Sequence, residues 1–246
     1  MPGQFINTGT TPGGNLKLIN NNNEGSLVME KLATLVLSLD AGNSASYPGS
    51  GTVWTDLVAG RTFDLYNGPG YDPANGGKFY FFAAGGQYAN CTSSLQSLPQ
   101  FTTSVWQNWD GNNIGGAPCI LTEVYSGTIN YFVGNLQGVV AQGGYFNGGF
   151  QISPQFNLTP GTWYNIVTTC DSNQVVSIYL NGTLISSTPT TGPVPSSSNA
   201  GINLMRRWDN AEFWGGYLST VSIYDGALSS PKVAALWNST KSRYGY

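Results

Sequence analysis

The sequence stretch that decides the fold is Gly215-Gly-Tyr-Leu-Ser-Thr-Val-Ser-Ile-Tyr-Asp-Gly-Ala-Leu-Ser229, a strand pattern that starts with two glycines and leads into a helix. Residues 157–171 and 175–186 precede it with two more strand patterns. Asn181-Gly182 interrupts the second of these, and such a pair is typical of a two-residue type I′ hairpin because both turn positions need positive φ. The last third of the chain is therefore predicted to be a series of short strands closed by one helix.

The closing helix is predicted from its first residues and from an apolar stripe. Ser230 suits the N-cap position and Pro231 the first helical position. Val233, Leu236 and Trp237 follow at the i, i+3, i+4 spacing of one helix face. We expect this face to seal one end of a β-sandwich, with Trp237 in the core.

Alternating apolar residues predict further strands earlier in the chain. Residues 35–40, Leu-Val-Leu-Ser-Leu-Asp, alternate as a half-buried strand does. Residues 101–106, Phe-Thr-Thr-Ser-Val-Trp, place Phe101 and Val105 on one face and Trp106 on the other. At 246 residues, the chain has the size of one large all-β domain.

Four motifs resemble those of one superfamily. They are Asp40-Ala-Gly42 followed by Trp54-Thr-Asp-Leu57, the Phe-Thr-x-Ser-x-Trp pattern at 101–106, Ile202-Asn-Leu-Met-Arg206, and the closing Lys241-Ser-Arg-Tyr-Gly245. Together they resemble the laminin-G-like branch of the concanavalin A-like lectin and glucanase superfamily, in the form found in virion proteins of phages and large viruses. The resemblance implies an all-β jelly-roll sandwich over residues 34–246 with one short C-terminal helix. Two positions depart from the family pattern: Met205 replaces a residue that is usually small, and Phe82-Ala-Ala-Gly85 replaces the usual Phe-Asp-Gly.

The composition argues against several classes of function. Charged residues make up only 9% of the chain, and a net charge of −3 with a pI near 4.7 argues against nucleic-acid binding, which needs a basic surface. The chain contains no histidine, which removes Ser-His-Asp and Cys-His catalysis and the usual zinc sites. No apolar stretch has the length of a membrane span.

Glycoside cleavage is not expected either. Hydrolases of this superfamily carry Glu-x-Asp-x-x-Glu along one strand, because two carboxylates must enter the same cleft. Glu123 has Leu121 and Tyr125 as its alternate neighbours, and the pattern does not occur in the sequence. We therefore expect a protein that is not an enzyme, with a polysaccharide depolymerase as the least favoured alternative.

Sugar binding requires an aromatic platform beside hydrogen-bonding side chains. Trp109-Asp110 and Trp208-Asp209 each set an aromatic ring next to an acid in a predicted loop, and Arg206 comes shortly before the second pair. The candidate ligand-binding residues are therefore Trp109, Asp110, Arg206, Trp208 and Asp209. The alternative is that these tryptophans pack in or around the core, as most tryptophans of a large sandwich do.

No cofactor is expected from the sequence. Calcium is common in the superfamily, and Asp209, Asn210 and Glu212 form the densest group of the oxygen ligands that it prefers. Their spacing matches no EF-hand, so a polar loop tip is the alternative. The three cysteines are widely spaced, with no metal-binding pattern, and we expect buried free thiols.

Residues 1–33 differ from the rest of the chain. Their Pro, Gly and Asn residues give little helix or strand signal, although residues 16–19 and 26–29 could each add an edge strand. We interpret this segment as an extended docking arm, with a disordered leader as the alternative. The first ten residues lack the basic and apolar parts of a signal peptide, so synthesis in the cytoplasm is expected.

Together these features predict a non-enzymatic structural protein of a virion surface, either a capsid decoration or a tail-fibre component. Its lectin-like domain would face outward, its arm would dock on other virion proteins, and copies of the chain would form a homo-oligomer. The alternative is a carbohydrate-binding lectin that recognises a cell-surface glycan.

Overall fold

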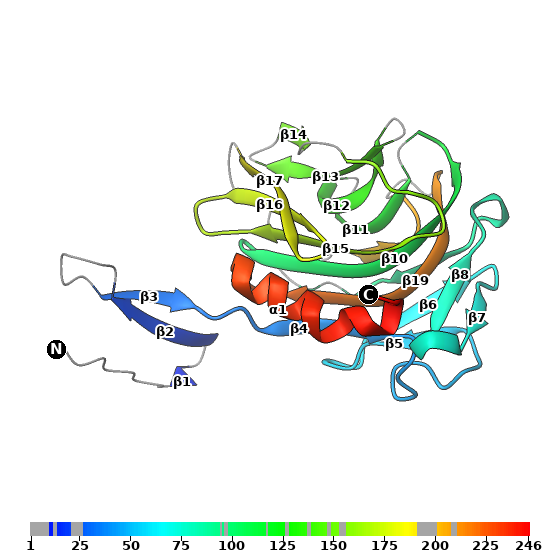
Figure 1. Cartoon of the computed structure of the whole chain (residues 1–246), viewed down its shortest axis with the longest axis horizontal. Helices are drawn as coiled ribbons and strands as arrows, with labels where there is room; N and C mark the ends of the chain where they lie inside the picture. Colours follow the sequence, from blue (N-terminus) through cyan, green and yellow to red (C-terminus); the bar gives the residue numbers. More distant parts are fainter. Residues whose placement is uncertain are drawn as a thin grey trace.

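The computed structural model describes residues 10–11, 14–20, 27–93, 95, 98–116, 118–125, 128–136, 139–146, 149–152, 156–190, 201–207 and 211–246. Only the backbone is described for those between 10 and 31 and between 123 and 152, and the side chains are described for the others. Most of these residues form two antiparallel β-sheets that pack face to face, and the α-helix α1 (Ser230–Thr240) lies on the outer face of one of them (Figure 1). This is the all-β sandwich with a short C-terminal helix that the sequence predicts.

The sheet beneath α1 is called sheet I. In the described part of the chain it has eight strands, in the order β17-β16-β15-β10-β19-β8-β7, with β4 also paired to β19. Their bounds are β4 (Leu35–Asp40), β7 (Gly70–Asp72), β8 (Lys78–Phe81), β10 (Phe101–Ile114), β15 (Trp163–Cys170), β16 (Val175–Leu180), β17 (Thr183–Pro189) and β19 (Phe213–Tyr224). β10 and β19 are the long central strands, and they pair from Thr102 opposite Tyr224 to Ile114 opposite Phe213.

The other sheet is called sheet II. Its described strands follow the order β14-β13-β12-β11-β18-β9-β6-β5. Their bounds are β5 (Val53–Thr55), β6 (Thr62–Tyr66), β9 (Tyr88–Cys91), β11 (Cys119–Tyr125), β12 (Thr128–Leu136), β13 (Val139–Phe146), β14 (Gly149–Ile152) and β18 (Gly201–Leu204). Short 3-10 helices complete the described fold, namely η1 (Ala74–Gly76), η2 (Ala83–Gly85) and η3 (Lys241–Tyr244).

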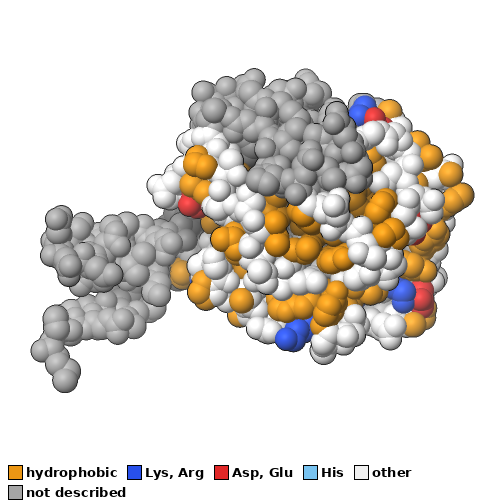
Figure 2. All heavy atoms as spheres, turned by 45° about the horizontal axis from the view of Figure 1, so that its top comes forward, with side chains coloured by type: hydrophobic (Ala, Val, Ile, Leu, Met, Phe, Trp, Pro, Cys, Tyr) orange, Lys and Arg blue, Asp and Glu red, His pale blue; other side chains and the backbone are white. Residues whose placement is uncertain are grey.

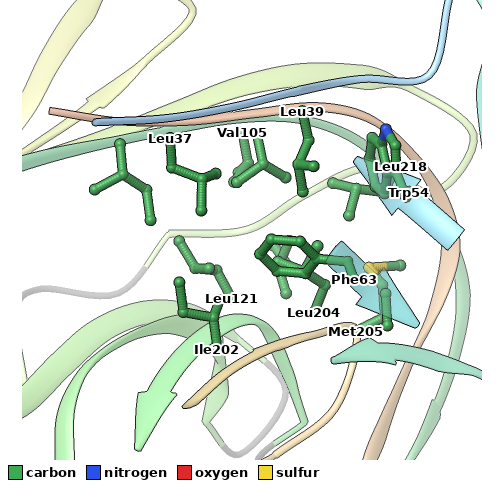
Figure 3. Close-up of a cluster of buried hydrophobic side chains, with 14 of the residues drawn as sticks. Leu37, Leu39, Trp54, Phe63, Val105, Leu121, Ile202, Leu204, Met205 and Leu218 are labelled. Carbon is green, nitrogen blue, oxygen red and sulfur yellow. The ribbon is translucent and has the colours of Figure 1, made fainter. Parts of the chain in front are cut away.

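The hydrophobic core lies between the two sheets. Figure 3 shows side chains of sheet I pointing toward side chains of sheet II, and among the fully buried ones are Leu37, Leu39, Val105, Leu121, Ile202 and Leu204. The alternation predicted for residues 35–40 and 101–106 is confirmed, because Leu37, Leu39, Phe101 and Val105 belong to this core while Trp106 faces the other way, toward α1. A sandwich of this kind needs inward-facing residues at alternate positions of each strand.

The predicted hairpin and thiols are also confirmed. Asn181 and Gly182 have φ values of 51° and 77°, as a type I′ turn between β16 and β17 requires. Cys91, Cys119 and Cys170 are buried and unbonded to one another. Burial raises the pKa of Cys170 to about 12, so this thiol stays protonated and unreactive.

The helix α1 lies across the outer face of sheet I and does not seal one end of the sandwich, so that prediction is wrong. The helix begins at Ser230, with Ser229 as its N-cap, and only Val233 of its residues is buried. Trp237 is half-buried and lies outside the core, because its partner is the Trp106 ring on the outer face of sheet I, at a centroid distance of 5.1 Å. The i, i+3, i+4 stripe therefore predicts an apolar helix face correctly, but it does not say which surface that face covers.

Residues before β4 form a third sheet. Its strands pair in the order β1 (Thr10–Thr11), β2 (Gly14–Asn20) and β3 (Leu27–Lys31), and in the described residues none of them pairs with sheet I or sheet II (Figure 1). The two segments expected as edge strands thus pair with each other, with Leu18 opposite Met29. Segments so close in the chain lose little entropy when they pair, which favours a local hairpin.

Candidate glycan-binding site

The predicted pair Trp109-Asp110 lies within strand β10, not at a loop tip. Trp109 is half-buried against the core, and its Nε1 donates a hydrogen bond of 3.1 Å to Asn113. Asp110 accepts hydrogen bonds from the Tyr80 hydroxyl at 2.8 Å and from the Asn112 backbone at 2.7 Å. The bond to Asp110 raises the pKa of Tyr80, which keeps the phenol protonated as the donor. The pair therefore has a structural role in the strand, because β10 continues past it to pair with β19.

The second predicted pair, Trp208-Asp209, lies outside the described residues, as does Asn210. Glu212, the remaining residue of the predicted calcium group, is described, and its carboxylate forms an ion pair with Arg207. In the portion of the chain that the structure describes, no group of three or more His, Cys, Asp or Glu side chains gathers where it could hold a metal ion.

Arg206 lies on the face of sheet II that points away from the core, where it is stacked with two tyrosines. Its guanidinium carbon lies 3.5 Å from the centre of the Tyr88 ring. The Tyr66 ring stacks on Tyr88 with centroids 4.5 Å apart and planes 8° apart. Since both partners are this close to Tyr88, they must lie on its opposite faces. Tyr66 is therefore the outer member of the stack, and 39% of its surface is exposed.

A polar row runs beside this stack. In β6 and β9, Phe63, Leu65, Ala89 and Cys91 point into the core, so the alternate residues Asp64 and Asn90 point outward. Register places Asp64 opposite Asn90, and Asn90 opposite Asn203 of β18. Asn90 Nδ2 donates to Asn203 Oδ1 at 2.8 Å, and the same oxygen accepts from Arg206 at 2.7 Å. These bonds fix the amides and the guanidinium relative to one another, while the Asp64 side chain is exposed.

The backbone conformation of Met205 explains the position of Arg206 and the small residue that is usual at this point of the family pattern. Met205 has φ of 63°, in the left-handed region that costs a non-glycine residue roughly 1–2 kcal/mol. Its N–H donates to the Ile120 carbonyl at 2.9 Å and its carbonyl accepts from Trp214 at 3.0 Å, so tertiary bonds hold this conformation. The resulting turn buries Met205 in the core and sends Arg206 outward. Backbone strain of this kind often marks a functional site.

The charge of Arg206 is not balanced by a neighbouring acid in the described structure. The side chain is 9% exposed, and none of the described ion pairs includes it. Burial lowers the pKa of Arg206, although the hydroxyl of Tyr88 partly opposes this effect. The guanidinium is instead stabilised by the face of the Tyr88 ring, a cation–π contact.

We call Tyr66, Tyr88 and Arg206, with Asp64, Asn90 and Asn203, the Tyr66 platform. It combines an exposed aromatic ring with carboxylate, amide and guanidinium groups on one sheet face, which is the combination that a sugar ring and its hydroxyls require. Of its members, the sequence predicts only Arg206. Alternation in residues 62–66 and 88–91 could have placed four of the others on outward faces, but not next to Arg206, which lies more than a hundred residues later.

Comparison with known proteins identifies the family. The family model described as "Concanavalin A-like lectin/glucanases superfamily", of the third laminin-G type, matches residues 82–234, which is more than half of the chain. The chain belongs to the concanavalin A-like lectin/glucanase superfamily. This agrees with the resemblance in the sequence motifs and with the sandwich described above. Comparison of the sequence with curated proteins gave no match.

Solved structures that resemble this superfamily member are mainly binding domains. Domain 4 of AbnA, an extracellular arabinanase of family GH43 from Geobacillus stearothermophilus solved with arabinotriose, matches with a TM-score of 0.64 and 17% identity over 83% of this chain and 98% of that domain. The binding domain of botulinum neurotoxin serotype G matches with a TM-score of 0.66 and 16% identity over 85% of this chain and 52% of that domain. The binding domain of Paraclostridial Mosquitocidal Protein 1 matches with a TM-score of 0.65 and 16% identity, over 83% and 52% of the two chains. The chain thus spans about half the length of these two binding domains, and the likeness concerns the fold.

Proposed function

We propose that this protein is a non-enzymatic glycan-binding module and that the Tyr66 platform is its binding face. The observation that carries the proposal is the exposed Tyr66 ring, which stacks on Tyr88 beside Asp64 and the bonded pair of Asn90 and Asn203, while Arg206 supports the far face of Tyr88. One face of a pyranose would lie on the Tyr66 ring, and its hydroxyls would bond the polar row. The AbnA domain, which has a similar fold and was solved with arabinotriose, supports a sugar as the ligand.

The non-enzymatic part of the proposal is supported by what the described carboxylates do. Asp40 pairs with Arg243, and Asp72 pairs with Lys78. Asp56, from the Trp-x-Asp-Leu motif, is 1% exposed and accepts bonds from the backbones of Ser38, Val58 and Ala59 and from Arg61. Each of these acids has a structural role, whereas glycoside cleavage needs two carboxyl groups facing one cleft.

We expect Tyr66→Ala to weaken glycan binding by about tenfold or more, because loss of one stacked ring removes on the order of 1–3 kcal/mol. The melting temperature should change little, since the ring is partly exposed and contributes only its stack to stability. The measurement is a glycan array with the full chain, followed by calorimetric titration of the best oligosaccharide. Leu184→Ala is the matched control, because Leu184 is 47% exposed on β17 of sheet I, away from the platform. Equal affinity of the Tyr66→Ala and Leu184→Ala variants would exclude the platform as the site.

We further propose that the module is displayed on a virion surface, as a capsid decoration or tail-fibre component, and that residues 1–33 attach it to other virion proteins. Two observations support an attached module. The third sheet pairs with neither sheet of the sandwich in the described residues, and because β1 has only two residues this sheet is little more than a two-stranded hairpin, which is only marginally stable on its own. The sparse charge of the chain, at 9% of residues, suits close packing of copies in an assembly, and the described part of the face in Figure 2 carries few Lys, Arg, Asp or Glu side chains. None of the helices in the described part of the chain has the length and apolar character needed to cross a membrane.

Deleting residues 1–33 is expected to leave a domain that still unfolds cooperatively, because β4 and all the core strands lie after this segment. The deletion should at the same time prevent incorporation into particles. The measurements are a denaturation curve of the shortened chain and mass spectrometry of purified particles made with it. Normal copy number without the segment would contradict the attachment role, and glycan binding by the same shortened chain would be unaffected in either case.

A further inference from the structure

A pocket lies between sheet I and the C-terminal segment. It has a volume of about 310 Å³, and its floor is formed by β4, β10 and β19 while α1 and η3 form its wall. Ser239 and Ser242, which line it, are exposed, so the pocket reaches the surface. It lies on the opposite sheet from the Tyr66 platform and does not depend on the function proposed for that face.

The floor of this pocket is a row of hydroxyl groups set by strand register. Ser104 of β10 lies opposite Ser222 of β19, and Ser222 lies opposite Ser38 of β4. Two positions along the same strands, the next row of side chains on this outer face consists of Trp106, Thr220 and Asp40. All of these residues line the pocket. A helix normally covers an apolar sheet face, so a floor of serines under α1 leaves a polar space rather than a packed interface.

The pocket carries little net charge. Among its lining residues the charged ones are Asp40 and Arg243, and these neutralise each other through two hydrogen bonds of 3.0 and 2.8 Å. The wall adds the apolar side chain of Leu236 and the ring of Tyr244. A ligand that fits must therefore be neutral, must both donate and accept hydrogen bonds, and must offer some C–H surface.

We propose that this pocket binds one neutral monosaccharide ring. The volume falls at the lower end of ligand pockets, which span roughly 300–1,000 Å³. The hydroxyls of Ser38 and Ser222 would bond the sugar hydroxyls, while Leu236 and Tyr244 would contact its C–H groups. This gives the module a second sugar site, on the face opposite the platform.

The test is saturation-transfer NMR of the full chain with glucose, galactose, mannose and arabinose, each at about 10 mM, which detects millimolar sites. We expect at least one of these sugars to receive saturation. Ser222→Val and, separately, Ser38→Val should weaken its binding about fivefold or more, because each removes one hydroxyl from the floor. Valine suits both positions because both lie within strands. Ser177→Val is the matched control, a partly exposed serine of β16 outside the pocket.

Four results would overturn the proposal. They are the absence of saturation for every neutral sugar, equal affinity for charged glucuronate, unchanged binding in folded Ser222→Val or Ser38→Val, and only water in the pocket of a crystal soaked with the bound sugar. The crystal result decides the matter even if both valine variants fail to fold. Tyr66→Ala separates this site from the platform, because it should weaken oligosaccharide binding at the platform and leave the saturation of the monosaccharide in this pocket unchanged.

Discussion

Replacing Trp106 with alanine is expected to lower the free energy of unfolding by about 3–5 kcal/mol, as removal of a large buried aromatic side chain does. The ring is 2% exposed and stacks with Tyr244 at 3.8 Å and with Trp237 at 5.1 Å. Its Nε1 donates to the Thr240 hydroxyl at 3.1 Å. Trp106 is thus the point on sheet I to which the C-terminal segment is fixed, and its loss should release residues 230–246 as well as leave a cavity.

For Trp106→Ala, urea denaturation is monitored by circular dichroism, and hydrogen exchange of the backbone amides is measured for residues 230–246. Trp237→Ala is the matched variant, because its ring belongs to the same stack but is only half-buried. We expect a clearly smaller loss of stability for Trp237→Ala. Equal losses in the two variants would contradict the assignment of Trp106 as the anchor.

Arg243→Ala is expected to destabilise the protein by about 3 kcal/mol, the lower end of the range for breaking a buried ion pair, because the side chain is partly exposed. Arg243 bonds both carboxylate oxygens of Asp40, the carbonyls of Gly76 and Gly77, and the Ser219 hydroxyl. It therefore joins the C-terminus to the end of β4 and to the loop before β8. Its removal leaves Asp40 without its ion-pair partner and takes one donor from the carbonyls of Gly76 and Gly77.

The close approach around Arg243 also explains two glycines. A Cβ at Gly42 would lie 1.5 Å from the Gly76 carbonyl oxygen, and one at Gly76 would lie 2.3 Å from Arg243 Nε.

Denaturation curves of Arg243→Ala and Arg243→Lys test the interaction. The stability of the lysine variant should lie between those of the wild type and the alanine variant, because lysine keeps the charge but lacks the planar guanidinium with its several donors. Lys232→Ala on the exposed side of α1 is the control, with an expected change within about 0.5 kcal/mol. A loss no larger than that of the control would show that the Arg243 bonds contribute little.

Much of the fold could be predicted from short-range sequence patterns. The alternation in residues 35–40 and 101–106 and the Asn181-Gly182 turn occur where the sequence places them, and the helix begins one residue earlier than predicted, with Ser229 and not Ser230 as its N-cap. These patterns are reliable because each depends on which neighbouring side chains share one face of one element. The family resemblance extends them to the whole sandwich, and the family match over residues 82–234 confirms it.

The candidate site could not be predicted in the same way. The sequence rule of an aromatic residue next to an acid selected Trp109-Asp110, but the structure uses both inside a strand, with Asp110 bonded to Tyr80. Arg206 was selected from the sequence, but only as a neighbour of Trp208-Asp209, while Tyr66 and Tyr88 were not selected at all. The three residues become a stack only through the pairing of β6, β9 and β18. Nothing local distinguishes such residues from packing residues.

The sequence alone therefore determined the class of fold, the strand faces and the presence of a C-terminal helix, because these follow from the period of apolar side chains within each segment. Only the tertiary structure decided that α1 lies over a hydroxyl-lined face of sheet I, that Arg243 ties the C-terminus to β4, and that Arg206 stacks on Tyr88. Each of these results joins residues that are distant in the chain. Their contacts depend on strand register and on the close approach of separate elements, which no local pattern encodes.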